Sequence, residues 1–292
     1  MSKNRNHQIS VMLREMADIL AGQDASPFRI TAYARAADTV GGYPTDIGSV
    51  LGSEGIDGLI SIPTIGRGIA AAIREIISTG RWAQLERLRG TLEPDRLFQV
   101  VPGIGPILAH RIHDELNIDT LEGLEQAAFD GRLKQVDGIS ERRLAAIAPA
   151  LDAMLGRRRQ HFEESATTIP VHVLLDLDCE YRRKATAKEL PLIAPRRFNP
   201  QAQPWLSIMH ATHEPWHFTV MYSNTALAHK IKRTSDWVVI YCYENDHREG
   251  QHTVVTETRG DLLGQRVVRG RENECRKFYS GQPAAKASPV GN

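Results

Sequence analysis

The sequence has few cysteines, no long apolar run and almost no net charge. Its three cysteines, Cys179, Cys242 and Cys275, are far apart and form no CxxC pair, which argues against a disulfide framework and a zinc knuckle. No apolar run approaches the ~20 residues of a membrane span, and residues 1–6 lack the apolar core of a signal peptide. We therefore expect a cytoplasmic protein without a membrane partner. The net charge of +1 excludes a large basic field, so contact with a polyanion must come from local backbone geometry.

Three segments of the N-terminal half repeat one pattern, in which a tight turn with a central isoleucine precedes a helical stretch. These segments are residues 62–73, 101–112 and 136–147. Apolar residues stand four and seven positions after the last small residue of each turn, as Ala70 and Ile73 do after Gly66. This spacing predicts one buried stripe on each second helix. The predicted helical hairpins lie near residues 60–78, 99–115 and 134–150.

Small residues in these turns predict a phosphate-binding surface. Glycine tolerates positive φ and lets another backbone come close. The first amides of the following helix have no intrahelical partner, and together with the helix dipole they attract phosphate whatever the base sequence. The alternative is a helical bundle with glycine-bearing turns and no ligand. The predicted DNA-contacting residues of the turns are Thr64, Gly66, Arg67, Gly68, Gly103, Gly105, Pro106, Gly138 and Ser140.

Several segments around the hairpins carry a family resemblance. They are residues 9–17 (ISVMLREMA), 27–37 (PFRITAYARAA), 78–81 (STGR) and 119–124 (DTLEGL). With the first two hairpins, they resemble the N-terminal part of family X DNA polymerases, in particular the lyase domain and thumb-side hairpin of polymerase beta. The third hairpin, preceded by residues 131–133 (GRL), is similar to bacterial members. The resemblance covers about residues 7–150, half of the chain.

The resemblance implies a role for individual residues. Arg29 and Tyr33 match the basic residue and the tyrosine that help to hold a 5′-phosphate in a DNA gap, and both side chains can hydrogen-bond phosphate. Gly68 replaces a family lysine, with Arg67 adjacent. Ala72 replaces the Schiff-base lysine of the lyase reaction, and no lysine lies between Lys3 and Lys134. Because alanine has no amine to attack a sugar aldehyde, we expect no lyase activity by the family route.

The family's hairpin carbonyls also bind a monovalent cation when DNA is present. By resemblance, a Na+ or K+ ion would be the only cofactor, and none is required. The matching carbonyls are those of Ile60, Ile62 and Ile65 in the first hairpin, and of Gln99, Val101 and Ile104 in the second.

The catalytic palm of these polymerases is not recognisable. Asp176 and Asp178 form a DxD after the apolar run 171–175, but no Gly-Ser element precedes them. Paired carboxylates are Mg2+ ligands in two-metal phosphoryl transfer. The alternative is that the two aspartates lie at a solvated strand end.

The residue pattern of the C-terminal half predicts strands as well as helices. β-branched and aromatic residues predict strands at residues 169–177, 218–222, 237–243, 253–258 and 265–268. Residues 223–232 predict one short helix. We therefore expect an α+β protein, with an all-α helix-hairpin-helix region over residues 1–160 and a separate mixed domain over 166–280. Residues 281–292 are expected to form a disordered tail.

Three kinds of polar or reactive residue stand out in this half. His210, His213, Glu214 and His217, with His229 further on, could ligate zinc, but Pro215 interrupts a helix there, so a polar loop is the alternative. The cysteines are interpreted as buried apolar groups. Arginines suit a second DNA surface or a solvated face; the clusters are Arg182 and Arg183 with Lys184, Arg196 and Arg197, and Arg266, Arg269 and Arg271.

These patterns favour a non-catalytic, sequence-independent DNA-binding protein of repair or replication. It would hold duplex, gapped or nicked DNA and meet repair-protein partners. Two alternatives stay open: a nuclease or nucleotidyltransferase with a diverged C-terminal site, and a helical protein-interaction module.

Overall fold

The computed structural model describes residues 2–155, 169–244 and 249–281, and the regular secondary structure of the first range is all helical. Its helices are α1 (Ser2–Gly22), α2 (Pro27–Gly42), α3 (Ile47–Ile60), α4 (Arg67–Thr79), α5 (Ala83–Arg89), α6 (Pro94–Phe98), α7 (Pro106–Leu116), α8 (Leu121–Phe129), the 3-10 helix η1 (Leu133–Gln135) and α9 (Glu141–Met154). None of the helices in the described ranges is long and apolar enough to span a bilayer.

The C-terminal half is built on an antiparallel sheet whose strands lie in chain order. Its elements are α10 (Val171–Thr186), β1 (Leu192–Ile193), β2 (Leu206–His213), β3 (Trp216–Tyr222), α11 (Ala226–Lys230), β4 (Val238–Glu244), β5 (Gly250–Thr256), the 3-10 helix η2 (Gly260–Leu262), β6 (Arg266–Val268) and α12 (Glu272–Gly281). The predicted fold class is confirmed: a helical region precedes a sheet with flanking helices.

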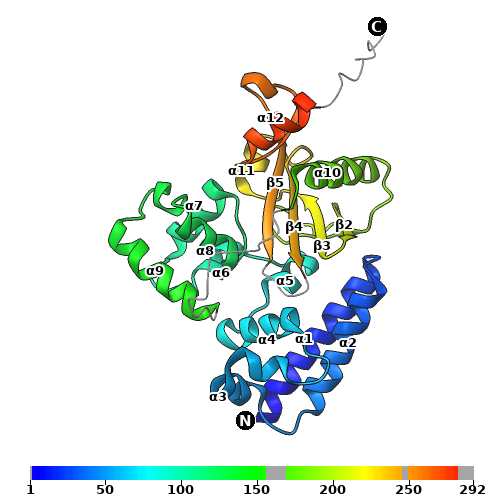
Figure 1. Ribbon diagram of the computed structural model, residues 1–292, viewed down its shortest axis with the longest axis vertical. Helices are drawn as coiled ribbons and strands as arrows, with labels where there is room; N and C mark the ends of the chain where they lie inside the picture. The colour runs from blue at the N-terminus through cyan, green and yellow to red at the C-terminus, as the bar shows by residue number, and fades with distance from the viewer. Residues whose placement is uncertain (1, 156–168, 245–248, 282–292) are drawn as a thin grey trace.

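Both faces of the sheet are buried, because successive residues of a strand point to opposite sides. On β4, Ile240 packs with α10 and α12, whereas Val239 and Tyr241 pack with residues of α1–α5. Figure 1 shows α1–α4 below the sheet, α6–α9 to its left, α10 to its right and α12 above it. One continuous core therefore joins the first five helices to one sheet face. The predicted boundary between residues 160 and 166 lies outside the described residues.

A separate core holds the second and third hairpins together. It contains the apolar residues of α6–α9 and their turns, including Phe98, Ile112, Leu124 and Leu151, which are all fully buried. Because this core is made by neighbouring segments, the tandem hairpins form one packed unit.

The predicted strand at residues 169–177 is wrong, since this segment begins α10. Val171, Leu174, Leu175 and Tyr181 are buried at helical spacing along the sheet, whereas Asp176 between them is exposed. A short run of β-branched and aliphatic residues does not distinguish a buried strand from a buried helix. The polar residues that follow the run belong to the exposed side of the same helix.

The other predicted strands are confirmed as β3, β4, β5 and β6, and the helix predicted at residues 223–232 contains α11. The sequence interpretation missed β1, β2 and α12, since prolines before β2 suggested a long connection. Gly281, the first residue of the predicted tail, ends α12, and the rest of that tail lies outside the described residues.

Candidate nucleic-acid interface

The first hairpin connects α3 and α4 by a turn over residues 61–66. Ile62 and Ile65 are buried, and the amide of Ile65 donates to the carbonyl of Ile62 at 3.1 Å. Thr64 has φ of +70°, an uncommon value for a β-branched residue, and its hydroxyl lies 2.8 Å from that of Thr39. Gly66 then begins α4 as its N-cap. The apolar plug between the two helices is therefore as predicted.

The second hairpin has the same construction between α6 and α7. Val101 and Ile104 are buried, and the amide of Ile104 donates to the carbonyl of Val101 at 3.1 Å. Gly103 has φ of +90°, which favours glycine. Gly105 is the N-cap of α7, and Pro106 occupies the first helical turn, where its missing amide leaves nothing unpaired.

The third hairpin differs at the start of its second helix. Ser140 caps α9 by accepting a hydrogen bond from the amide of Arg143 at 3.2 Å. Glu141 places a carboxylate in the first turn, and hydrogen bonding to Lys134 lowers the pKa of this carboxylate. This end of α9 therefore supplies its own acceptor and negative charge, and it offers less to a phosphate than α4 or α7.

Within the described residues, neither α4 nor α7 has a side-chain N-cap. Both N-cap positions are glycines, Gly66 and Gly105, which have no side chain that could accept a hydrogen bond from the first turn. The amides of Ala70 and Ala109 donate to the carbonyls of Gly66 and Gly105, each at 2.9 Å, and these hydrogen bonds begin the two helices. An anion at either helix start would therefore meet amide donors and the positive end of a helix dipole.

Neither backbone conformation nor packing requires glycine at these two caps. Gly66 and Gly105 have φ of −77° and −87°, which any L-residue adopts. A Cβ built on either glycine would meet nothing within 4 Å in the described part of the chain. The missing side chains leave clear space at both helix starts.

The comparison with protein families agrees with this geometry. Residues 4–82 match a helix-hairpin-helix domain family, and residues 56–117 and 96–152 match a SAM-like helix-hairpin-helix tandem. The N-terminal region consists of helix-hairpin-helix domains. Such domains are typical of sequence-independent DNA binding, which is consistent with a DNA-binding role. These matches do not tie the region specifically to family X polymerases, so the narrower resemblance stays a prediction.

Arg29 and Tyr33 lie in a buried layer between α2 and the sheet. Arg29 is 6% exposed, and its guanidinium lies 4.9 Å from the ring centre of Tyr243 on β4. Tyr33 is also buried, and burial raises the pKa of its hydroxyl although Arg29 opposes this. The predicted contact of these residues with a 5′-phosphate therefore requires a ligand that enters this layer.

Two other family positions are also placed by the structure. Ala72 is buried on α4. The carbonyls of Ile62 and Val101 each accept one amide within their turns, which leaves a lone pair on each oxygen. Cation binding by these carbonyls and by those of Ile60, Ile65, Gln99 and Ile104 stays a prediction.

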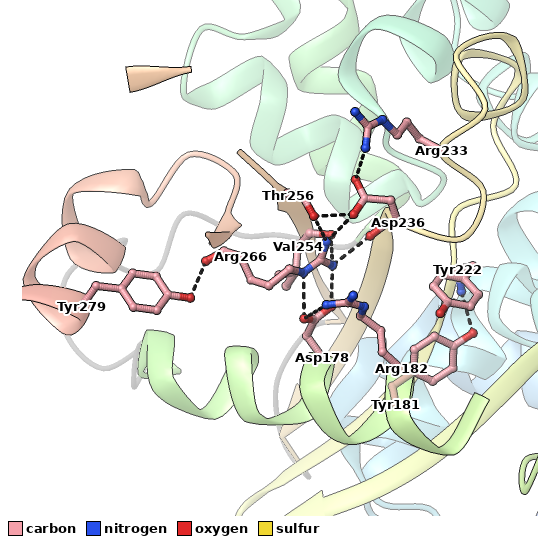
Figure 2. A network of polar contacts seen from close by, with 10 residues as sticks. All are labelled: Asp178, Tyr181, Arg182, Tyr222, Arg233, Asp236, Val254, Thr256, Arg266 and Tyr279. Carbon is pink, nitrogen blue, oxygen red and sulfur yellow. Dashed lines mark hydrogen bonds and ion pairs between the residues drawn. The ribbon is translucent and has the colours of Figure 1, made fainter. Parts of the chain in front are cut away.

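The two aspartates of the DxD do not converge. On α10 they are separated by about 200° around the helix axis, and Asp176 is exposed whereas Asp178 is 1% exposed. Figure 2 shows Asp178 beside Arg266, whose guanidinium donates to both of its oxygens at 2.9 and 2.6 Å. Arg266 also donates to Asp236 at 2.7 Å. The interpretation of Asp178 as part of a solvated strand end is wrong, because it belongs to a buried ion-pair network.

The histidines lie on a β-hairpin and not on a loop. His210 and His213 are on β2, and His217 is on β3. His210 donates to Gln23 through Nε2 at 3.0 Å and accepts from the hydroxyl of Thr219 at Nδ1, so both nitrogens are engaged. Burial, followed by the charge of Arg29, lowers the pKa of His210 to about 3. No three potential metal ligands of the His, Cys, Asp and Glu type gather in the described ranges.

The prediction that the cysteines are buried holds for two of the three. Cys242 and Cys275 are buried as predicted, but Cys179 is exposed on α10 because it follows the buried face by one residue.

The arginines of the C-terminal half are mostly ion-paired with neighbouring acids. These pairs are Arg183 with Glu189, Arg196 with Glu93, Arg197 with Asp95, Arg269 with Glu257 and Arg271 with Glu274. Their charges are therefore partly compensated within the protein.

Sequence reasoning missed a charged cluster between α5 and the sheet. Arg87 is 3% exposed and forms a two-pronged ion pair with Glu249 at 2.8 and 2.9 Å. Its position four residues after the buried Ala83 places it on the apolar face of α5. A charge at a core position was the available signal, but its partner lies 162 positions away in the chain.

Proposed function

We propose that this protein binds DNA without regard to sequence, by placing backbone phosphates against the starts of α4 and α7. The observation that supports this proposal is that both helices begin at glycine caps that the fold itself does not require and that leave space for a ligand at the helix start. The third hairpin would add a weaker contact, because its helix start is capped by Ser140.

The preferred substrate in this proposal is gapped or nicked DNA, in repair or replication. Two hairpin units in separate cores would contact the backbone at two places along the DNA. The preference for an interrupted strand rests on the resemblance to family X polymerases. The absence of an amine at Ala72 supports a role in holding DNA without lyase chemistry.

Fluorescence anisotropy on matched oligonucleotides tests this proposal. Intact duplex, nicked duplex and a gapped duplex with or without a 5′-phosphate would be titrated at the same salt concentration, each in two unrelated sequences. We expect equal affinity for the two sequences, and tighter binding of the interrupted duplexes. Tight binding of only one sequence would contradict phosphate recognition, and equal binding of all DNA structures would refute the gap preference alone.

A further inference from the structure

An exposed phenylalanine lies on the loop that connects β1 and β2. Phe198 is 47% exposed, although phenylalanine is among the residue types that are most often buried. Its ring centre lies 4.4 Å from that of His229 in α11, and the guanidinium of Arg197 lies 5.2 Å from the Phe198 ring centre. Two neighbours therefore hold this ring, while about half of the residue stays open to solvent.

Hydrogen bonds fix the groups on which Phe198 packs. The Asn224 side chain donates to the carbonyl of Arg197 at 3.3 Å, and its Oδ1 accepts from Nε2 of His229 at 2.6 Å. Trp205 meets the His229 ring edge-on, with 6.2 Å between the ring centres. Phe198 itself has φ of +54°, which is uncommon for a bulky residue and persists only where the surroundings hold it. The exposed ring therefore has a defined place on the surface.

The two segments that meet at this ring carry basic residues and no acid. Residues 194–205 contain Arg196 and Arg197, and residues 223–235 contain Lys230, Lys232 and Arg233. The three arginines form ion pairs with acids of neighbouring segments, which are Glu93, Asp95 and Asp236. The two lysines are exposed and form no ion pair with any residue of the described ranges. Two positive charges next to His229 therefore remain for a ligand.

This surface adjoins the second hairpin. Arg196 and Arg197 lie 3.4 and 3.9 Å from the carboxylates of Glu93 and Asp95, both at the start of α6. The amide of Arg196 also donates to the carbonyl of Gly90 at 2.7 Å. In addition, α11 packs against α7. The loop and α11 therefore both rest on the α6–α7 hairpin, in which the start of α7 is the proposed phosphate site.

An unpaired nucleobase suits this surface better than other acidic ligands do. Proteins that bind single strands combine aromatic side chains, on which bases stack, with basic residues along the backbone. Intact duplex DNA keeps its bases stacked in pairs, so it would leave the Phe198 ring unused. An acidic peptide would use the two lysines and would also leave the ring exposed. The combination of ring and charges thus points to a single strand.

We propose that Phe198 stacks on a base of single-stranded DNA while Lys230 and Lys232 contact its phosphates. Every base has a π-face, so the contact accepts any sequence. In gapped DNA, this site would hold the unpaired strand. It adds to the hairpin contacts of the proposed function and does not depend on them.

Fluorescence anisotropy of the full chain with two probes of equal length tests the stacking. One probe is oligo(dT), and the other is the same backbone with abasic sites, which carries the phosphates without bases. We expect oligo(dT) to bind about tenfold more tightly. Phe198→Leu, which is apolar without an aromatic ring, should largely remove this difference, and Phe198→Tyr should retain it. Equal binding of the two probes, or an unchanged difference in Phe198→Leu, would overturn the proposal.

The salt dependence of oligo(dT) affinity tests the lysines. Each phosphate contact to a single strand contributes ~0.7 to the slope of log K against log salt, so the double variant Lys230→Gln, Lys232→Gln should reduce this slope by about 1.4. The control Lys277→Gln removes an exposed lysine of α12 and should leave it unchanged. An unchanged slope in the double variant would contradict the phosphate contacts. Displacement of oligo(dT) by polyaspartate as effectively as by unlabelled oligo(dT) would assign the surface to an acidic protein and overturn the proposal.

Hairpin variants distinguish this site from the proposed function. The double variant Gly66→Val, Gly105→Val should lose affinity for intact duplex and keep the difference between oligo(dT) and the abasic probe. Phe198→Leu should show the reverse. If the parent chain ignores duplex but binds oligo(dT) through Phe198, the hairpin mechanism fails and the single-strand site stands. Loss of the oligo(dT) preference in the hairpin variant would place the bases at the hairpins and overturn the proposal.

Discussion

At the scale of single residues, the turn glycines divide into two kinds. Gly103 and Gly138 have φ of +90° and +94°, so the backbone itself favours glycine there. Gly66 and Gly105 have ordinary backbone angles and open space where a Cβ would lie, so the fold would accept a side chain. The first pair shapes the turns, and the second pair leaves room for a ligand.

This division predicts different effects on stability. Gly66→Ala and Gly105→Ala should change the free energy of unfolding by less than about 0.5 kcal/mol, as for surface substitutions. Gly103→Ala should reduce it by about 1–2 kcal/mol, because the left-handed conformation disfavours a Cβ. Urea denaturation of the three variants measures this. A loss from Gly105→Ala as large as that from Gly103→Ala would show that the cap glycine serves the fold.

A second residue-scale prediction concerns His210. Its folded pKa is lowered to about 3, against ~6.5 in an unfolded chain. The unfolded chain therefore takes up the proton first on acidification, so the stabilisation is complete above pH ~6.5 and decreases as the pH falls towards 3. Between pH 7 and pH 5, the free energy of unfolding should therefore fall by about 1–2 kcal/mol less in His210→Gln than in the parent chain. Urea unfolding curves at the two pH values measure this, and an equal loss in both proteins would refute it.

At the scale of elements, the buried ion pairs of Arg266 attach α10 to the sheet. Asp178 on α10 and Asp236 before β4 both accept from this guanidinium, which is 14% exposed (Figure 2). Removing one partner of such a pair leaves an uncompensated buried charge. The network therefore makes the position of α10 dependent on one side chain of β6.

We expect Arg266→Gln to reduce the free energy of unfolding by about 3–5 kcal/mol. The control Arg269→Gln removes a neighbouring arginine with a 45% exposed side chain, paired with Glu257, and should change it by less than about 1 kcal/mol. Urea denaturation of both variants compares them directly. Similar small losses would show that the buried network contributes little to stability.

The elements that could be predicted from the sequence are those defined by local patterns. The hairpins were predicted because turn residues and helical spacing lie within about a dozen positions of each other, as in residues 62–73. The apolar run at residues 169–177 predicts a strand, although it begins α10, because such a run by itself suits either structure. The hydrogen bond from Tyr241 to Asp119 could not be predicted, since these residues are 122 positions apart and meet only through packing.

At the scale of the whole molecule, the sheet completes the core of the first five helices. Leu206, Met221 and Tyr241 share one cluster with residues of α1–α5. This packing also covers Arg29 and Tyr33, which local sequence comparison had placed at a phosphate site. The C-terminal half therefore changes which surface of the helical region can meet a ligand.

Truncation tests this dependence. A fragment of residues 1–155 lacks the apolar sheet face, so its helices should unfold at a lower temperature than those of the full chain. Circular dichroism melting curves of the two proteins measure the difference. An unchanged melting temperature in the fragment would contradict a shared core.

The most direct test of phosphate binding by the hairpins is the DNA affinity of the double variant Gly66→Val, Gly105→Val. Its added side chains should block phosphate at both helix starts, with a loss of about tenfold per hairpin. The affinity of this variant should also decrease less steeply with salt concentration, because fewer counterions are released on binding. The control Gly52→Ala, at an exposed position with open space in α3, should bind as the parent chain does. An affinity and salt dependence equal to those of the parent chain would contradict the hairpin mechanism.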